Sequence, residues 1–353
     1  MKRKIVSIYS LIHFIVDLSC AILVTNLVTQ KMGLGEKLFI AIIIYNFFAF
    51  AVQLPVGIIA DKVNKNALCS AIGCLLVAAA YAFSSYGVIA CIIAGIGNSM
   101  FHVGGGIDVL NISEHNASLS GIYVSTGAMG IFLGSMSAKF GFNKYYIIVL
   151  ILIISAILLY WLYSQIKDKV SNVEMIIPKL AANEKVAIAC LIFTVCIRSY
   201  VGLILSFEWK TNMILAVLAI FAVIFGKMLG GIIGDRIGFK KISIISLSIS
   251  SVLFLFAFNT PIAGILAILF FNMTMPITLT ALSNILDNNR GMAFGLLTLA
   301  LFVGSVPKFF GIGASIFSPI GLFVITFISL VVLYIGIKKY EKYVEKKIWY
   351  KVW

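Results

Sequence analysis

The six residues Gly57–Lys62, GIIADK, return as GIIGDR at Gly231–Arg236, a shift of 174 residues. Three further identities occur at the same shift, and they join Asn98 to Asn272, Gly121 to Gly295, and Gly130 to Gly304. One short motif alone is a weak signal, but several coincidences at a single offset indicate an internal repeat. Because 174 is about half of the 353 residues, the copies are predicted to be the two halves of the chain.

The composition of the chain decides what kind of protein is duplicated. Hydrophobic residues make up 61% of the sequence and charged residues only 11%, whereas soluble domains contain about 45–50% and about 25% respectively. Too few polar side chains are present to cover a surface that faces water. The composition therefore excludes a soluble enzyme, a disordered chain, a coiled coil and a small disulfide scaffold, and it predicts an integral membrane protein.

The apolar runs have the length and spacing of transmembrane helices. Each span needs about 20 apolar residues, or roughly 30 with its connection, so the chain has room for about twelve spans. We therefore predict an all-α membrane protein with twelve transmembrane helices, near residues 5–28, 38–60, 67–85, 88–110, 119–140, 145–165, 185–207, 212–234, 242–260, 262–286, 291–312 and 318–337. The first run contains Asp17 and no small-residue cleavage site, which favours a retained span over a signal peptide.

The formal charge of +14 would suit a nucleic-acid partner, but the location of the charges argues against one. Most of the 27 Lys and Arg residues fall on alternate connections, which become cytoplasmic if the amino terminus is inside. This is the positive-inside asymmetry that orients membrane proteins. Both termini are therefore predicted to be cytoplasmic, in the inner or plasma membrane, with no nucleic-acid partner.

The repeat and the charges together predict the domain organisation. An even number of spans in each copy keeps both copies in the same orientation, so two parallel six-helix repeats are expected. The predicted parts are an amino-terminal half at 1–165, a polar cytoplasmic linker at 166–184, a carboxyl-terminal half at 185–337 and a basic aromatic tail at 338–353. The tail mixes lysines with Tyr and Trp, as is typical of anchors at an anionic lipid surface.

Two ionisable residues in the first span are the leading site candidates. Asp17 lies near the middle of the span, where an ionised carboxylate costs about 2.5–3.5 kcal/mol on insertion scales. His13 stands four residues earlier, so both side chains lie on one helix face and are close enough to share a proton or a hydrogen bond. We predict that they face a polar cavity. The alternative is a structural pair that fastens the first span to a neighbour.

Other polar residues stand at similar depth in later spans. Asn98 and His102 repeat the four-residue spacing in the fourth span, Asn272 takes the symmetric place in the tenth, and Arg198 lies near the middle of the seventh. They are predicted to converge on the same cavity, although lone intramembrane His and Asn residues also serve as hydrogen bonds between packed helices.

The charges within the spans predict the kind of solute. Arg198, Lys227 and Lys308 outnumber Asp17 at depth, which makes the interior net positive. An anionic or zwitterionic solute is therefore expected. Arg198 is its predicted counter-charge because a guanidinium can hold a carboxylate or phosphonate with two hydrogen bonds.

Glycines cluster in the fourth and fifth spans. In a helix each glycine gives up about 1 kcal/mol of propensity, so a cluster indicates close helix contact or a bend. We predict a hinge in the fourth span at Gly104, Gly105 and Gly106. In the fifth span we predict a sliding surface at Gly127, Gly130 and Gly134, with plain tight packing as an equal alternative. The triple glycine is not a nucleotide-binding loop, because no Lys-Ser/Thr pair follows it.

The repeated motif resembles the signature of the major facilitator superfamily, G-x-x-x-D-[RK]-x-G-[RK]-[RK], which follows the second span. The first copy matches it at Gly57, Asp61, Lys62 and Lys65, with Asn64 and Asn66 as departures. The second copy carries Gly231, Asp235, Arg236, Gly238, Lys240 and Lys241, with the final basic pair displaced by one residue through Phe239. The resemblance implies two halves that rock about a central site lined by spans one, four, seven and ten. It also implies that these motif residues form a cytoplasmic latch, whereas helix capping by Asp235 is the plainer alternative.

Within that superfamily the chain looks most like the fosmidomycin-resistance-type exporters. These carry H-x-x-x-D in the first span and a G-x-G-x-x-x-F-H-P-like pattern in the fourth, matched here by His13 and Asp17 and by Gly95–His102, with Val103 at the proline position. The resemblance implies export of a small solute in exchange for protons, by a monomer without metal or cofactor. Uptake of a metabolite anion is the alternative within this class, and a non-transporting receptor or a membrane enzyme is the alternative outside it.

Overall fold

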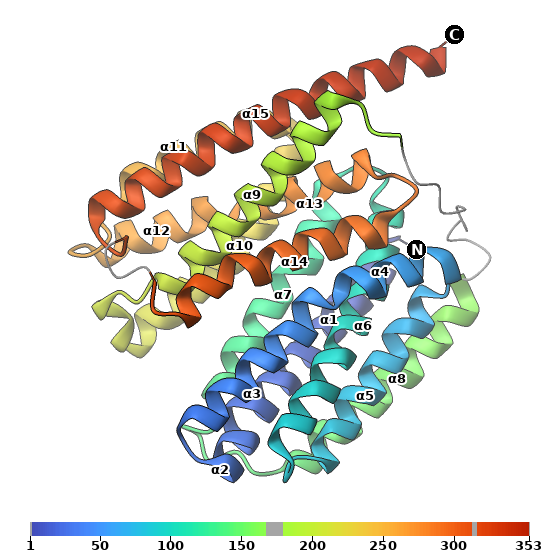
Figure 1. Ribbon diagram of the computed structural model, residues 1–353, viewed down its shortest axis with the longest axis vertical. Coiled ribbons are helices and arrows are strands. Elements are labelled where there is room, and N and C mark those ends of the chain that lie inside the picture. Colours follow the sequence, from blue (N-terminus) through green and yellow to red (C-terminus); the bar gives the residue numbers. More distant parts are fainter. Residues whose placement is uncertain (1, 167–178, 313–315, 353) are drawn as a thin grey trace. The chain divides into compact units, whose positions relative to one another are not determined.

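The computed structural model describes residues 2–166, 179–312 and 316–352, and it is built from helices joined by short connections (Figure 1). Clustering of backbone contacts divides the chain into two compact units. Unit 1 comprises Met1–Glu114, Ile122–Met175 and Asn288–Leu299, and unit 2 comprises His115–Gly121, Ile176–Asp287 and Ala300–Trp353. Residues 115–121 of the first sequence half therefore belong to unit 2, and residues 288–299 of the second half belong to unit 1.

The helices that contribute to unit 1 come mainly from the first half of the sequence. They are α1 (Lys2–Ile22), η1 (Leu23–Val28), α2 (Thr29–Met32), α3 (Glu36–Asn46), η2 (Phe47–Ala51), α4 (Gln53–Val63), α5 (Asn66–Ala82), α6 (Gly87–Ser113), α7 (Ala117–Met136) and α8 (Tyr145–Ile166). The π-helical turns η1 and η2 continue their neighbours without a break, so α1 to α2 and α3 to α4 each form one long helix.

The second half of the sequence supplies the remaining helices. They are α9 (Ala182–Ile204), η3 (Glu208–Thr211), α10 (Met213–Ile237), α11 (Phe239–Phe254), α12 (Pro261–Asn272), α13 (Thr274–Ile285), α14 (Arg290–Phe309) and α15 (Pro319–Val352). The Asn212 side chain caps α10 by accepting from the backbone amides of Ile214 and Leu215. Pro261 opens α12, where its missing amide proton costs no helical hydrogen bond.

Within the described residues, ten helices are long and apolar enough to cross a membrane. The predicted spans 67–85 and 242–260 coincide with α5 and α11, which have 17 and 16 residues. The prediction of an all-helical, multi-pass membrane protein is thus confirmed. The count of twelve spans and the cytoplasmic placement of both termini stay predictions.

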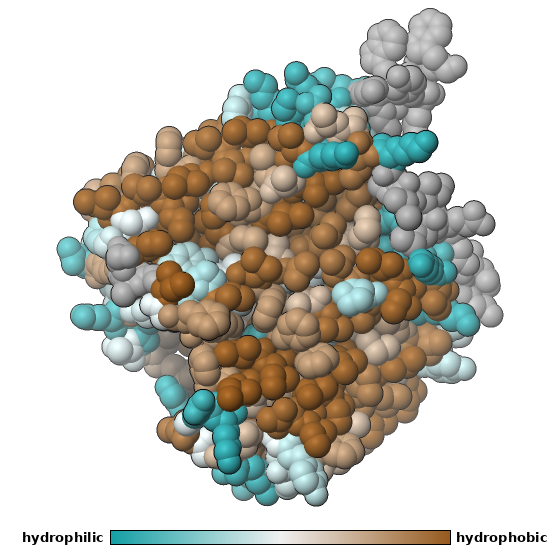
Figure 2. All heavy atoms as spheres, viewed as in Figure 1, coloured by the Kyte–Doolittle hydropathy of each residue, from teal (hydrophilic) through white to brown (hydrophobic). Residues whose placement is uncertain are grey.

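Large apolar side chains lie on the outside of the helices. Figure 2 shows them over most of the visible helix surface. Examples with more than half of their surface exposed are Leu150, Ile157 and Trp161 on α8 and Ile214 on α10. A surface of this kind is stable against lipid and not against water.

Glycines bring α5 and α6 into backbone contact. A Cβ added at Gly73 would lie 2.5 Å from the backbone nitrogen of Phe101, and one at Gly104 would lie 2.2 Å from the carbonyl oxygen of Asn66. Helix α6 runs unbroken through its three consecutive glycines. Gly105 faces Tyr9, and Gly106 faces the ring of Phe294. Close packing accounts for this run, and the predicted hinge stays a hypothesis.

Helix α7 packs on α1 through the glycines of the predicted sliding surface. A Cβ at Gly130 would lie 2.4 Å from the carbonyl oxygen of Phe14, and one at Gly134 would lie 2.5 Å from that of Leu18. Gly127 faces the side chains of His13 and Asp17. The contact holds α7 against the face of α1 that carries the ionisable pair, while sliding along it remains a hypothesis.

Part of the predicted domain organisation falls outside the described residues. Most of the linker predicted at 166–184 belongs to residues 167–178, which the structure does not describe. Helix α15 continues through Lys338 into the predicted tail. The division into halves at 165 and 185, the linker and the lipid-anchoring tail therefore stay predictions.

Candidate functional site

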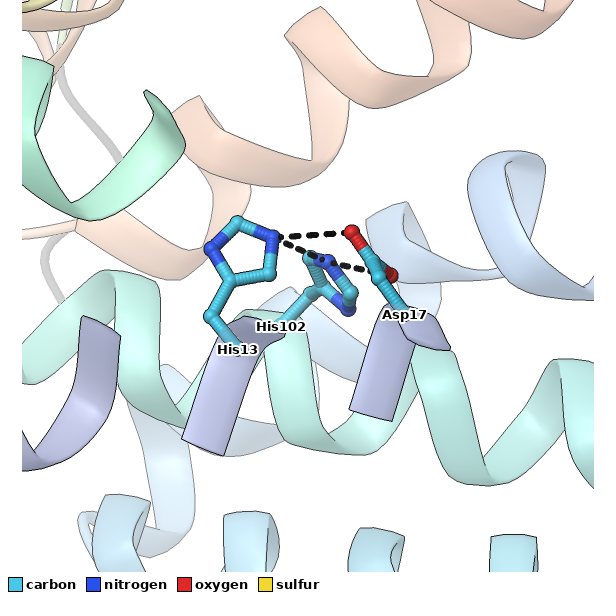
Figure 3. Close-up of side chains that lie close together, drawn as sticks. All are labelled: His13, Asp17 and His102. Atoms are coloured by element: carbon cyan, nitrogen blue, oxygen red, sulfur yellow. Dashed lines mark hydrogen bonds and ion pairs between the residues drawn. The ribbon is translucent and has the colours of Figure 1, made fainter. Parts of the chain in front are cut away.

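The ionisable residues of the first and fourth predicted spans meet inside unit 1. His13 and Asp17 project from α1 and His102 from α6, and the three side chains point toward one another (Figure 3). The two Nε2 atoms are 2.8 Å apart. The Nε2 atom of His13 lies 3.2 Å from Oδ2 of Asp17, and that of His102 lies 3.4 Å from Oδ1. We call these three residues the histidine–aspartate cluster.

Backbone carbonyls fix the proton positions on both imidazoles. Nδ1 of His13 lies 2.8 Å from the carbonyl oxygen of Tyr123, and Nδ1 of His102 lies 2.9 Å from that of Asn98. A carbonyl oxygen only accepts, so each Nδ1 carries its proton, and in a neutral ring Nε2 is then a lone pair. Two lone pairs and a carboxylate would repel one another at these distances. The cluster therefore requires a positive occupant, either an added proton or a metal ion.

Neighbouring residues orient the carboxylate and keep water away. The amide of Asn98 donates to Oδ1 of Asp17 at 3.1 Å and also contacts Sγ of Cys20 at 3.7 Å. The side chains of His13, Asp17 and His102 are only 6%, 9% and 12% exposed. Because an isolated buried charge is expensive, the two histidines and Asn98 are what stabilise this carboxylate within the span.

A second buried carboxylate lies along the same two helices. The hydroxyl of Tyr9, one turn before His13 on α1, donates to Oδ2 of Asp108 on α6 at 2.5 Å. The amide of Asn66 donates to the other oxygen at 2.9 Å. No sequence pattern described above predicted this trio. The four-residue spacing of Tyr9 and His13 was a signal that could have indicated it, because it places both on one face of α1.

Unit 2 holds a buried cation of a different character. Arg198 on α9 is 8% exposed, and its Nη1 donates to Oγ1 of Thr278 on α13 at 3.1 Å. No carboxylate of the described residues lies within ion-pair distance of its guanidinium. Asn272 donates to the carbonyl oxygen of Ile268 in its own helix at 2.8 Å, and among the described residues no hydrogen bond joins it to Arg198. Lys227 lies on α10, where its carbonyl faces Gly121.

Both aspartates of the repeated motif cap the start of a helix. In unit 1, Asp61 accepts from the backbone amides of Gly291 and Met292 at 2.7 and 2.8 Å, at the beginning of α14. In unit 2, Asp235 accepts from those of Ala117 and Ser118 at 2.7 and 2.9 Å, at the beginning of α7, and from the Ser118 hydroxyl. Negative charge is favourable there because the amide groups of a helix start are unpaired and carry the positive end of its dipole.

Lys240 of the second motif binds a residue other than Asp235. The resemblance had placed Lys240 and Asp235 together in the predicted latch. In the structure Lys240 forms an ion pair with Glu341 of α15 at 2.9 Å, and this carboxylate raises the pKa of the lysine. Asp235 is held by backbone amides, as the capping alternative had it. Whether the caps open during a functional cycle is a separate question, so the latch stays a hypothesis.

No protein-family profile matches the sequence, and no curated protein matches it. Solved structures do match. The human organic anion transporter MFSD10 (TETRAN) aligns with a TM-score of 0.68 at 13% identity, covering 95% of this chain and 99% of that chain. The major facilitator superfamily transporter FucP, in its outward conformation, aligns with 0.64 at 13% identity over 95% and 98%. A bacterial homologue of the iron transporter ferroportin aligns with 0.60 at 12% identity over 97% and 99%.

The chain has the major facilitator superfamily fold. At these identities the likeness is one of fold alone, and the resemblance to the fosmidomycin-type subgroup stays a prediction. The alignments span nearly the whole of this chain and of each matched chain.

Contacts in this major facilitator fold repeat with the same 174-residue offset as the sequence. Gly291 and Ala117, which the two aspartates cap, are one offset apart, and so are Met292 and Ser118. Gly57 packs against the backbone of Gly291, and Gly231 packs against that of Ala117. The capped residues were not predicted from sequence, because the offset relates the two capped pairs to each other and does not connect either aspartate to its partner.

Proposed function

We propose that this chain is a secondary active transporter of the major facilitator superfamily that moves a small anionic or zwitterionic solute by alternating access. The fold supports transport, since the solved proteins that share it are transporters, and one of them carries organic anions by its description. The proposal places the protein in the cell membrane as a monomer. It assigns the solute to Arg198 and the coupling ion to the histidine–aspartate cluster.

Arg198 is the observation that carries the choice of solute. A buried guanidinium without an ionic partner leaves most of its five donors and its full charge uncompensated. Its described polar contact is the single hydrogen bond to Thr278. A carboxylate or phosphonate would accept two charge-assisted hydrogen bonds from the guanidinium. We infer that the solute supplies this group, with Lys227 and Asn272 as further cavity residues.

Proton coupling is the second part of the proposal. The histidine–aspartate cluster requires a positive occupant, and an exchangeable proton between two imidazoles and a carboxylate meets that requirement. The same residues carry the resemblance to the fosmidomycin-resistance-type exporters, which supports export in exchange for protons. Asp17 and His102 are the proposed proton carriers.

Alternating access needs contacts that form in one state and break in the other. The caps by Asp61 and Asp235 suit this role, because each consists of two or three hydrogen bonds to the first turn of a helix. We propose that they stabilise one access state. The neighbouring motif residues, which complete the proposed latch, are Gly57, Lys62, Lys65, Gly231, Arg236, Gly238 and Lys240.

The solute class is tested with the purified full chain in proteoliposomes. Fosmidomycin and salicylate are the anionic probes, and salicylamide is the neutral match for salicylate. We expect flux of at least one anion and none of salicylamide. Arg198→Gln should abolish this flux, Arg198→Lys should retain part of it, and Arg3→Gln, an exposed arginine at the start of α1, should leave it unchanged. Unaltered flux in folded Arg198→Gln protein would contradict the assignment.

Direction and coupling need a separate measurement. An imposed pH gradient should drive accumulation against the solute gradient in vesicles of known protein orientation, and reversing the gradient should reverse the flux. Asp17→Asn should leave solute exchange intact and abolish the response to pH. Gradient-driven flux that survives this change would exclude Asp17 as the coupling group. Accumulation on the cytoplasmic side would favour uptake, and binding without flux would favour a receptor.

A further inference from the structure

The donor atoms of the histidine–aspartate cluster also form the pattern of a metal site. We propose that His13, Asp17 and His102 bind one divalent transition-metal ion. One ligand atom from each residue lies within 4.8 Å of the others. Two imidazoles and one carboxylate on one side of an ion are a recurrent ligand set for divalent transition metals, and they leave other coordination positions open.

The separations of the donor atoms agree with coordination to a common ion. With bonds of about 2.0–2.1 Å, two ligands are about 2.9 Å apart at a right angle and about 3.3 Å apart at a tetrahedral angle. The two Nε2 atoms are 2.8 Å apart, and the carboxylate lies 3.2 Å from His13 through Oδ2 and 3.4 Å from His102 through Oδ1. Each imidazole thus lies at a ligand-to-ligand separation from its own carboxylate oxygen, so an ion would be held by both imidazoles together with one or both oxygens of Asp17.

Hydrogen bonds from neighbouring residues fix the orientation of these ligands. Metal-bound histidines commonly donate their second ring nitrogen to a carbonyl or carboxylate, which fixes the ring and directs the lone pair at the metal. Both imidazoles do so here, to the carbonyls of Tyr123 and Asn98. The Asn98 amide orients the carboxylate of Asp17 in the same way. The lone pairs are thus directed at one point before any ion arrives.

Gly127 lets two of the donors pack directly against α7. A Cβ at this position would lie 2.2 Å from Oδ2 of Asp17 and 2.4 Å from Nε2 of His13. These distances are too short for a methyl group, so a larger residue at 127 would displace the donors. Glycine at this position therefore preserves the arrangement of the donor atoms.

The ligand types indicate the class of ion. Imidazole suits zinc, cobalt, nickel, copper and iron, whereas magnesium and calcium favour sites made of oxygen atoms alone. Cys20 contacts Asn98 through its sulfur and is not part of the ligand group. We therefore expect binding of Zn²⁺ and Co²⁺ and no measurable binding of Mg²⁺.

The inference is independent of the solute and the direction of transport proposed above. A metal ion and a proton require the same lone pairs, so each excludes the other from the cluster. Metal binding is measured on the purified chain without any flux. Its failure would leave the transport proposal standing, and a chain that binds metal without transporting anything would support this inference alone.

The test is a Co²⁺ titration of the full chain in lipid nanodiscs, after removal of any histidine tag. Absorption reports the ligand field, and calorimetry with Zn²⁺ reports the stoichiometry. We expect one ion per chain. His102→Gln and Asp17→Asn remove a ligand and should weaken binding by at least about tenfold. His115→Gln is the matched control, because His115 is the chain's third and last histidine and binds Asn284 of unit 2.

Gly127→Ala tests the arrangement of the donors. It retains all three ligand side chains but displaces two of them, so we expect this variant to bind the ion more weakly than wild type. Thermal unfolding of each variant verifies that it is folded. Absence of Co²⁺ and Zn²⁺ binding to wild-type protein at millimolar metal would overturn the inference and assign the cluster to a proton. Equal binding by wild type and folded His102→Gln would overturn it too.

Discussion

The two helix caps differ in burial, and this difference predicts unequal effects of the same substitution. Asp61 is 7% exposed, whereas Asp235 is exposed. Replacing either residue with Asn keeps its shape and one acceptor oxygen, but it removes the charge and one of the two backbone hydrogen bonds. We therefore compare Asp61→Asn with Asp235→Asn.

The magnitude follows from the environment of each carboxylate. A charge at a helix start contributes about 0.3–1 kcal/mol when exposed and up to about 2 kcal/mol when partly buried. Since 1.4 kcal/mol corresponds to a factor of ten, Asp235→Asn should speed local opening of α7 by about two- to fivefold. Asp61→Asn should speed opening of the α14 start by up to about thirtyfold.

Amide hydrogen exchange of the chain in nanodiscs measures both openings. The segment containing Gly291 and Met292 should exchange faster in Asp61→Asn only, and the segment containing Ala117 and Ser118 in Asp235→Asn only. Each variant is thus the control for the other. Equal effects at the two sites, or a larger effect in Asp235→Asn, would refute the reasoning from burial.

Two further predictions concern packing and pH. Gly57→Ala should lower the free energy of unfolding by about 1–3 kcal/mol, because its Cβ would lie 2.1 Å from the carbonyl oxygen of Gly291. Gly202→Ala on α9 has nothing within 4 Å of the added Cβ and should raise the free energy of unfolding by up to about 1 kcal/mol. A denaturant titration that ranks the two variants in the reverse order would contradict the packing argument. Burial lowers the pKa of Lys210, in the connection η3, to about 8, whereas an unfolded lysine stays charged to about pH 10.4. The free energy of unfolding should therefore rise between these pH values in wild type and not in Lys210→Met. Parallel pH profiles of the two proteins would refute this prediction.

Hydropathy and the repeat carried most of the fold prediction. The apolar runs predicted all-helical spans, and the described helices follow them closely, because a chain in lipid must pair its backbone groups within each helix. The offset of 174 residues also reappears in the contacts of both motif aspartates. Sequence could not predict the capped partners, because Asp61 and Gly291 are 230 positions apart and no local rule connects them.

The candidate site divides in a similar way. Helical spacing predicted that His13 and Asp17 share a face, and the structure places them in contact. His102 joins them from another helix, and its lone pair is directed at them only because its Nδ1 donates to a backbone carbonyl. Asn272 was predicted to line the same cavity; its amide donates to a carbonyl oxygen of its own helix, and its place in the cavity stays a prediction.

What the sequence determined by itself was the class of protein and its repeat, because hydropathy and self-similarity are properties of the linear chain. Only the tertiary structure decided that two imidazoles and a carboxylate converge with their lone pairs facing one another, and that one motif aspartate is buried while its copy is exposed. These outcomes depend on which helices pack together and at what distance. Packing of this kind is set by many weak contacts between residues far apart in the chain, and short stretches of sequence do not encode it.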